Sequence, residues 1–292
     1  MTSHLPGPFV HTPVAFNYAS ASSNKIHDDA TARRLGFAGA LVPGVASYGY
    51  LTHSAVEALG EDWCSRGSAS IRLASPVYEG DRVSARAAWA PGLEGRKVVL
   101  ELLDGSGALC AEGWAALDWP DDAGDPLGVP EPASYPRSTL PEPEGRPQAS
   151  LETLRAGNVL GSLSIGPWPR EELPRIAEQY RDPSPRYAAD AADAAEGALH
   201  PAHLLHAANQ ILVRNALLGP WIHLASSVRH VKPVDVERRH EMRGRVAEAT
   251  ARRGHEIVTL DLALFDDDER PVTAIRHTAI IRPRSLLRGV PA

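Results

Sequence analysis

The chain has 292 residues, of which 43% are hydrophobic and 23% charged, so it has the composition of a globular protein and the length for one large domain or two smaller ones. A formal net charge of -6 provides no basic field, which argues against nucleic acid or an anionic membrane as the main partner. No run approaches the ~20 apolar residues of a membrane helix, and no signal-peptide pattern opens the chain. We therefore expect a cytoplasmic protein that acts on a small molecule or a protein.

The first half of the chain predicts a strand, one helix and then three more strands. An opening strand falls around Phe9 to Asn17, and an apolar helix follows at Val45 to Leu59 after an irregular polar stretch. Alternation of apolar and polar residues then predicts strands at Arg82 to Trp89, Val98 to Leu103 and Ala108 to Leu117. The Asp-Gly-Ser-Gly sequence between the last two suits an antiparallel hairpin.

Apolar periodicity is lost between Trp119 and Ser150, where eight prolines fall within 28 positions. Each proline ring fixes a backbone angle, so this stretch predicts a stiff and extended linker. It divides the chain into an N-terminal domain at 1–118, the linker at 119–150 and a C-terminal domain at 151–292.

The second half repeats the order of elements of the first. An opening strand is predicted around Asn158 to Ile165 and a helix at Ala202 to Leu218, in which apolar residues recur every three or four positions. Alternating runs then predict strands at Met242 to Ala249, Ile257 to Phe265 and Val272 to Ile281. One long helix followed by antiparallel strands can wrap into a curved sheet around that helix.

A short sequence repeat links the two halves. Ser70 to Val77 shares its Ser-x-Arg and Pro-Val positions with Ser227 to Val234, at an offset of 157 residues. Gly44 and Pro201, at the two predicted helix starts, are related by the same offset. We interpret this as an internal duplication. The predicted fold class is α+β, a double hotdog: two units, each an antiparallel sheet wrapped around a long helix, fused as a pseudo-dimer.

The segment from Tyr18 to Gly44 carries the most informative motif. It resembles the hydratase motif of the MaoC-like (R)-specific enoyl-CoA hydratases, in which Asp-Phe-Asn-Pro-Ile-His precedes a short helix, a Gly-Phe pair and a His-Gly at the start of the hotdog helix. The matching residues are Asn24, Ile26, His27, Asp29, Ala32, Gly36, Phe37 and Gly44. Together with the hotdog elements on both sides of the linker, the resemblance covers most of the chain.

The resemblance implies hydration or dehydration of an α,β-unsaturated acyl thioester. In that family a carboxylate and an imidazole hold a water between them; one takes its proton and the other protonates the α-carbon. The thioester carbonyl accepts a hydrogen bond from a backbone N–H at the start of the hotdog helix, where the helix dipole stabilises an enolate oxygen. Carried over, His27 is the acid/base and the Gly44 N–H is the oxyanion donor. The structural alternatives are a solvated helix start at His27 and a glycine that simply begins the helix.

Two residues depart from the motif. The position of the carboxylate, five residues before the histidine, is Ser22, and the His of the His-Gly pair is Pro43. A serine hydroxyl can orient a water but has no useful basicity near neutral pH. We therefore expect Ser22 and Asn24 to shape the water position, with His27 as the principal acid/base.

The second half holds a different part of the motif. Asp182 lies five residues before Tyr187, and His200 keeps the histidine at the helix start. Asp182 could complement His27 as a catalytic carboxylate across the two halves, although in known double-hotdog hydratases both residues come from one half. His200 and Tyr187 are candidate substrate-binding residues on this side of the cleft.

Other polar residues have functional interpretations that compete with structural ones. Arg72 and Arg229 occupy equivalent places in the repeat and could either bind a CoA phosphate or form ion pairs. His200, His203 and His206 resemble a metal-ligand set, but on a helix the third is rotated away from the first two, and no cysteine or well-placed carboxylate completes the set. We expect no metal site.

Three functions fit these residues. The first is a hydratase or dehydratase of an enoyl-CoA-like thioester, carried by CoA or by an acyl carrier protein, with the acyl chain in an apolar tunnel between the halves and no metal or redox cofactor. The second is a hotdog thioesterase, or a lyase on an unusual substrate, for which loss of the carboxylate is expected. The third is a non-catalytic protein that binds an acyl group or another ligand. A fused pair also leaves outer sheet edges that can pair again, which allows a homodimer.

Overall fold

The computed structural model describes residues 8–120, 127–187 and 198–284. The first half contains one long helix, α2 (Gly44–Leu59), in the place that the sequence predicts. Its strands are β1 (Phe9–His11), β2 (Ser68–Leu73), β3 (Ser84–Trp89), β4 (Lys97–Leu103) and β5 (Leu109–Ala116). Its shorter helical segments are η1 (Lys25–His27), α1 (Asp29–Arg34) and α3 (Trp63–Arg66).

The second half has the same order of main elements around the long helix α5 (Ala202–Asn215). Its strands are β6 (Val159–Ile165), β7 (Ile222–His230), β8 (His240–Arg252), β9 (His255–Asp266) and β10 (Pro271–Arg282). Shorter helical segments are η3 (Pro132–Ser134), η4 (Pro143–Gly145), η5 (Arg170–Glu172), α4 (Leu173–Glu178) and η6 (Pro185–Tyr187).

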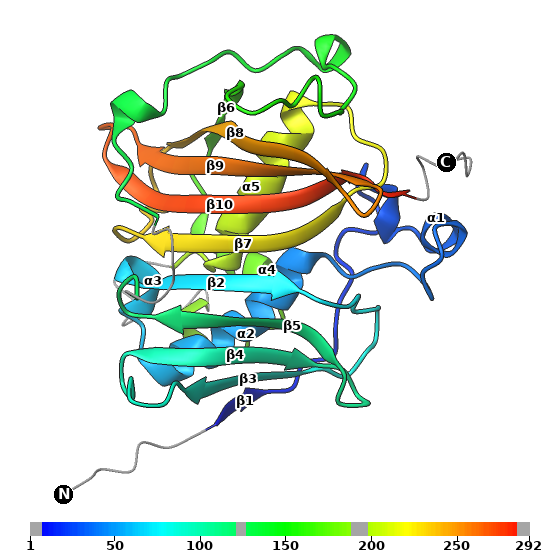
Figure 1. Cartoon of the computed structure of the whole chain (residues 1–292). Coiled ribbons are helices and arrows are strands. Elements are labelled where there is room, and N and C mark those ends of the chain that lie inside the picture. Colours follow the sequence, from blue (N-terminus) through cyan, green and yellow to red (C-terminus); the bar gives the residue numbers. More distant parts are fainter. Residues whose placement is uncertain (1–7, 121–126, 188–197, 285–292) are drawn as a thin grey trace, which may run out of the picture.

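All of these strands belong to one antiparallel sheet with the order β1-β3-β4-β5-β2-β7-β10-β9-β8-β6. The order within the first half is repeated in reverse by the second half. Figure 1 shows α2 and α5 on the same side of this sheet, each behind the strands of its own half. The two halves thus pair edge to edge through β2 and β7, as expected for a fused pseudo-dimer.

The joint between the halves is symmetric about one pair of equivalent residues. In the register of β2 and β7, Ser70 lies opposite Ser227, and Ser68 lies opposite Arg229. The Ser70 and Ser227 hydroxyl oxygens are 2.9 Å apart and are separated by 157 residues in the chain, the offset of the sequence repeat. A pseudo-twofold axis therefore passes between these serines.

The two long helices differ in how far they are buried. Apolar or small residues surround α2 on almost every side, which is typical of a helix enclosed by protein, and its buried residues include Tyr48, Tyr50 and Leu51. On α5 the buried face alternates with polar residues such as the partly exposed His206 and the exposed Arg214. No helix in the described ranges is long and apolar enough to span a membrane.

Two predicted elements are longer than those observed. The opening strand is limited to Phe9–His11 because beyond it Val14 forms an isolated bridge with Arg82. Helix α5 ends at Asn215 instead of Leu218, because Ala216 adopts an extended backbone. The other predicted strands agree with the observed ones to within a few residues at each end.

Trp119, at the start of the predicted linker, packs against Trp114 of the first half, whereas the part from Leu127 onward lies against the second half. Ala149 donates its N–H to the Leu217 carbonyl oxygen at 2.9 Å. The Arg137 guanidinium bonds to carboxylates of Glu241 and Glu269. The extended path fits the high proline content, and the domain boundaries drawn from it remain a prediction.

Gly49 allows α2 to approach the second half closely. A methyl group at this position would lie 2.7 Å from Tyr180 Cβ, an atom that cannot move without its backbone. We expect Gly49→Ala to lower the free energy of unfolding by about 1 kcal/mol, because an overpacking cost of about 1–3 kcal/mol exceeds the gain in helix propensity of about 1 kcal/mol. Urea denaturation measures the change. Gly128→Ala is the control, since nothing lies within 4 Å of its Cβ position, and an equal or greater stability for Gly49→Ala would contradict the prediction.

Candidate functional site

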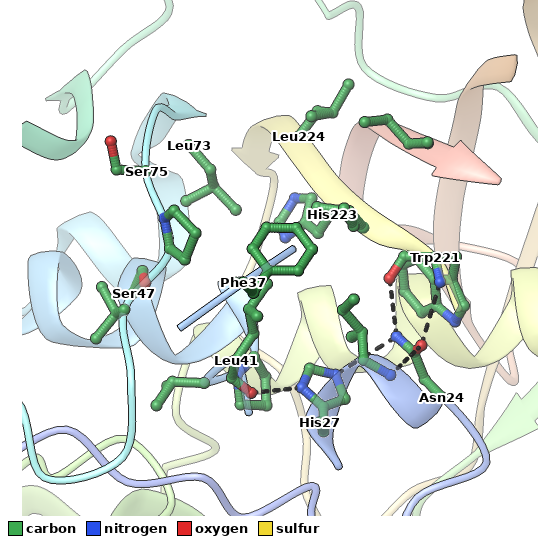
Figure 2. A pocket seen from close by; sticks show the side chains of 18 of the residues that line it. Asn24, His27, Phe37, Leu41, Ser47, Leu73, Ser75, Trp221, His223 and Leu224 are labelled. Carbon is green, nitrogen blue, oxygen red and sulfur yellow. Dashed lines mark hydrogen bonds between the residues drawn. The ribbon is translucent and has the colours of Figure 1, made fainter. Parts of the chain in front are cut away.

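A cavity of about 210 Å³ lies at the N-terminal end of α2, between the two halves. The first half forms most of its wall, which Asn209 of α5, Trp221 to Leu224 around the start of β7, and Ile280 of β10 complete. Figure 2 shows His27 and Asn24 among the side chains around this space. The wall is mainly apolar with a few polar groups, as is usual for a site that binds a small molecule.

His27 enters the cavity from the end of η1 with a defined tautomer. Its Nδ1 lies 2.7 Å from the Leu41 carbonyl oxygen, which can only accept, so Nδ1 carries the proton and donates it. Nε2 keeps its lone pair and lies 3.5 Å from the Asn24 amide nitrogen, a long contact that leaves the lone pair available. Burial lowers the pKa of His27, and the hydrogen bond to Leu41 opposes this in part. The ring is therefore neutral near pH 7 and able to accept a proton.

Asn24 holds this segment against the second half. Its Oδ1 accepts hydrogen bonds from the backbone N–H groups of Ile26 and Trp221, at 3.3 and 3.2 Å. Its Nδ2 donates to the Trp221 carbonyl oxygen at 3.0 Å. This two-way bond with Trp221 fixes the orientation of the amide next to His27 and ties the start of β7 to the motif.

Gly44 is the first residue of α2 and lines the cavity. A Cβ atom at this position would lie 2.3 Å from Leu73 Cδ1 and 3.0 Å from His223 Nδ1, so its neighbours leave no room for a side chain. Pro43 before it makes no side-chain cap to the helix. The positive dipole end of this 16-residue helix thus lies at the cavity wall.

His223 is a cavity residue that the sequence analysis did not identify. Its side chain is buried, with Nε2 2.8 Å from Ser226 Oγ, while Nδ1 has no hydrogen-bond partner in the described part of the chain. Burial lowers the pKa of His223 to about 4, and a hydrogen bond between the ring and the Ala225 backbone opposes this in part. The repeat gave no signal for it, because the equivalent position in the first half is Arg66. Asn209 Oδ1 is a second buried atom of the cavity wall that lacks a partner among the described residues.

Ser22 lies outside the cavity wall. Its hydroxyl donates to the Asn24 carbonyl oxygen at 3.3 Å, so it supports the loop instead of facing the space beside His27. Among the residues that the structure describes, no carboxylate lines the cavity or bonds to His27. Within the described ranges, the imidazole is therefore present without the carboxylate of the MaoC-like dyad.

Asp182 does not complement His27, because it is bound elsewhere. Its carboxylate accepts hydrogen bonds from His53 Nδ1 at 2.8 Å and from His200 Nε2 at 3.1 Å. His200 Nδ1 in turn accepts from the Ala202 N–H at 3.2 Å, which places the His200 proton on Nε2. Burial alone would raise the pKa of the Asp182 carboxyl, but the hydrogen bonds from His200 and His53 hold it well below its ordinary value.

This cluster fills the region of the second half that corresponds to the cavity of the first. Tyr187, the counterpart of His27 in the motif, is buried and packs over His200 at 5.0 Å between ring centroids. Pro201, the counterpart of Gly44, has no N–H to donate. His200 and Tyr187 are thus placed together, but in a packed core apart from the cavity, and their predicted substrate-binding role is unsupported there.

The two arginines of the repeat also lie away from the cavity. Arg72 is exposed and pairs with Glu112 across the neighbouring strand. Arg229 donates to the Leu127 carbonyl oxygen at 2.8 Å. Neither side chain is among those lining the cavity. Arg72 thus forms the ion pair of the structural interpretation, whereas the contact of Arg229 is a hydrogen bond to the backbone.

The histidines of α5 have separate neighbours. His203 Nδ1 lies 3.4 Å from the Tyr180 hydroxyl, and His206 Nε2 lies 3.5 Å from the Gln210 amide nitrogen. Elsewhere in the described ranges, the carboxylates of Asp266 to Asp268 come within 4.8 Å of one another. Lys232 and Arg238 already pair with these carboxylates.

Solved structures with the same fold cover nearly the whole chain. A protein of Chloroflexus aurantiacus named as a MaoC-domain dehydratase aligns over 96% of both chains with a TM-score of 0.63 and 14% identity. A Mycobacterium tuberculosis protein described as having a double hotdog fold aligns over 94% of this chain and 95% of its own, with a TM-score of 0.61 and 15% identity. The chain is a double hotdog. The predicted α+β fold class is confirmed, and MaoC-like dehydratases are among the structures that share this double-hotdog fold.

The likeness of this double hotdog to known proteins lies in its fold. No protein-family model matches the sequence, and no curated protein matches it significantly. A further structure with the fold is named as an oleoyl thioesterase of Lactobacillus plantarum, with a TM-score of 0.51, 10% identity and coverage of 95% of this chain and 97% of the other. Proteins named as dehydratases and a protein named as a thioesterase thus share this architecture.

The Asp182 cluster gives the double hotdog a stability that depends on pH. The pKa of Asp182 is lowered, so its contribution is present above its ordinary pKa of 3.8 and is lost as the pH falls through the native value. Burial would lower the pKa of His53, but Asp182 and Glu57 raise it from 6.5, so its contribution is present below 6.5 and is lost as the pH rises through the native value. The pair therefore stabilises most between pH 3.8 and 6.5.

We expect Asp182→Asn to lower the free energy of unfolding by about 3–5 kcal/mol in that window, because it removes one member of a buried pair. Urea denaturation at a series of pH values measures the difference from the unmodified protein. Asp62→Asn is the matched control, since Asp62 pairs with Arg66 while 74% of its side chain is exposed. A difference that is small, or that does not shrink above and below the window, would show that the cluster carries no such ion pair.

Proposed function

We propose that the chain is a hydratase or dehydratase of a small α,β-unsaturated acyl thioester of the enoyl-CoA type, with His27 as its acid/base. The observation that carries the proposal is the unprotonated His27 Nε2 in a mainly apolar cavity that also receives the N-terminal end of α2. The first group accepts and returns a proton, and the second stabilises negative charge on a carbonyl oxygen. The shared fold with proteins named as MaoC-like dehydratases supports the same reaction class.

In the hydration direction, His27 Nε2 takes a proton from a water as the water oxygen bonds to the β-carbon. The electron pair of the C=C bond moves toward the carbonyl, whose oxygen becomes an enolate and accepts a hydrogen bond from the Gly44 N–H. The imidazolium then returns its proton to the α-carbon, which restores the neutral ring and the thioester carbonyl. Dehydration is the same sequence in reverse.

This mechanism uses one imidazole where the MaoC-like dyad uses two groups. Asn24 orients His27 through its bonds to Trp221, and it supplies an amide beside Nε2 that can help to place the water. Asn209 Oδ1 offers a further acceptor on the opposite half of the cavity wall. Because no described carboxylate touches His27, we expect a slower reaction than a complete dyad provides.

Hydrolysis of the thioester is the second candidate. A lone general base that activates water, next to a donor for the carbonyl oxygen, is sufficient for attack on the carbonyl carbon with the thiol as leaving group. The missing carboxylate favours this alternative, and a protein named as a thioesterase shares the fold. Crotonyl-CoA tests both reactions at once, since hydration removes the conjugated absorbance and hydrolysis releases a free thiol.

We expect His27→Gln to lower the turnover of crotonyl-CoA by about 10²-fold or more, because it removes the general base. Loss of conjugated absorbance and release of thiol are followed side by side. His206→Gln is the matched control, because His206 is a partly buried histidine of α5 outside the cavity wall. Turnover that survives in His27→Gln would exclude His27 as the acid/base, and binding without turnover by the unmodified protein would favour a ligand-binding protein.

The pH profile provides an independent test of His27. Burial disfavours the imidazolium and lowers its pKa from the ordinary 6.5, and the reaction needs the neutral ring. We therefore expect kcat/KM to be constant near pH 7 and to fall on the acid side with a midpoint below 6.5. A midpoint at or above 6.5 would indicate that a different group, or a charged His27, limits the reaction.

A further inference from the structure

A second imidazole, that of His223, lines the cavity from the second half. It belongs to a short buried chain of hydrogen-bonding groups, which we call the relay: His223, Ser226 and His277. His223 on β7 lies with Nε2 2.8 Å from Ser226 Oγ, and the same oxygen lies 3.0 Å from His277 Nδ1 on β10. The two rings are 4.4 Å apart between centroids. The exposed fractions of His223, Ser226 and His277 are 6%, 3% and 0%, so the relay is held inside the protein.

The other ring nitrogen of His223, Nδ1, lies next to the start of α2. His223 Nδ1 would be 3.0 Å from a Cβ atom on Gly44, and His223 lines the cavity that Gly44 also lines. Nδ1 has no partner among the described residues. Leaving such a buried polar atom unpaired is unfavourable, and a ligand atom that bonds to it removes this penalty. Figure 2 shows that His223 and His27 belong to different parts of the wall.

The proton arrangement along the relay has two neutral forms. If His277 Nδ1–H donates to Ser226 Oγ and the hydroxyl donates to His223 Nε2, then His223 carries its proton on Nδ1. If instead His223 Nε2–H donates to Ser226 Oγ and the hydroxyl donates to His277 Nδ1, then His223 Nδ1 is an unprotonated acceptor. A carbonyl oxygen at the start of α2 can only accept, so its presence selects the form with a proton on Nδ1.

We propose that His223 is a further catalytic residue, whose Nδ1–H donates a hydrogen bond to the carbonyl oxygen of the bound acyl thioester beside the Gly44 N–H. The inference rests on the proposed function and adds a second donor for the enolate oxygen. Ser226 and His277 are positioning residues, because they fix the proton on Nδ1 without touching the substrate. The second half thereby supplies a donor to a site whose base comes from the first half.

A neutral imidazole is well suited to this role. Burial lowers the pKa of His223 to about 4 and also that of His277, where the nearby His223 adds to the effect. A neutral ring polarises a carbonyl by donating a hydrogen bond, without placing a full positive charge in an apolar cavity. The donor also needs no reorganisation when charge develops on the oxygen, because the strand and the relay hold the ring.

Butyryl-CoA, with 13C at the thioester carbonyl, is a saturated probe that cannot be hydrated. Its carbonyl stretching band, measured by isotope-edited infrared spectroscopy, should lie at lower frequency when bound to the unmodified protein than when bound to His223→Gln. Glutamine can preserve the contact that Nε2 makes with Ser226 but has no group in the place of Nδ1. His230→Gln is the matched control, since His230 is equally buried on β7 and lies outside the cavity wall, and it should leave the band unchanged.

Turnover of crotonyl-CoA separates the inference from the proposed function. We expect His223→Gln to lower kcat by about 10²-fold, the usual effect of removing one oxyanion donor. If crotonyl-CoA is hydrated but the band is the same in His223→Gln, the inference fails and the proposed function stands. If the band depends on His223 while crotonyl-CoA is not turned over, the proposed function fails, and His223 stands only as a donor to the bound carbonyl oxygen and not as a catalytic residue. Failure of the unmodified protein to bind butyryl-CoA overturns both.

A measurement on the unmodified protein covers the case in which His223→Gln does not fold. In 15N-histidine spectra of the complex with butyryl-CoA, His223 should be neutral and protonated at Nδ1, and Ser226→Ala should convert it to a mixture of both neutral tautomers. A purely structural serine would leave the tautomer unchanged. A His223 ring protonated at Nε2 in the complex overturns the inference.

Discussion

The pairing of β2 with β7 is the constraint on which the rest of the structure depends. It joins the two halves into one sheet about the axis between Ser70 and Ser227. Because β7 is held next to β2, its first residues reach the N-terminal end of α2 and the motif around His27. Asn24 completes this connection through the backbone of Trp221. The cavity thus forms only where β2 and β7 pair the two halves, and neither half could form its wall alone.

The same pseudo-symmetry makes the differences between the halves informative. At one end of the joint, a glycine begins the long helix and a neutral imidazole faces a cavity. At the other end, Pro201 removes the N–H, and Asp182 is satisfied by His53 and His200. One crevice is an open cavity whose wall includes His223 Nδ1 and Asn209 Oδ1, which have no partner among the described residues, whereas the corresponding region around Asp182 is a hydrogen-bonded core. Under the proposed function, the duplicated fold divides its two crevices between chemistry and stability.

Two buried neutral histidines, His27 and His223, line the cavity from opposite halves. Burial favours the uncharged form of both His27 and His223, and each ring has one nitrogen engaged by the protein and one directed toward the cavity. For His27 the engaged atom is a donor, which leaves an acceptor; for His223 the relay can leave a donor. Two imidazoles of opposite hydrogen-bonding character, from opposite halves, can thus act on one substrate.

The sequence by itself determined the main elements, the duplication and the segment that carries His27 and Gly44, because apolar periodicity, turn residues and motif spacing are local properties of the chain. It could not show that Ser22 turns away to the Asn24 carbonyl, or that Asp182 is taken up by His53, a residue 129 positions away with no motif around it. It also gave no sign of His223, whose counterpart in the repeat is an arginine. Which polar groups meet, and which nitrogen of each ring stays unpaired, depends on the register of β2 against β7 and on the packing around α2, and these contacts exist only in the tertiary structure.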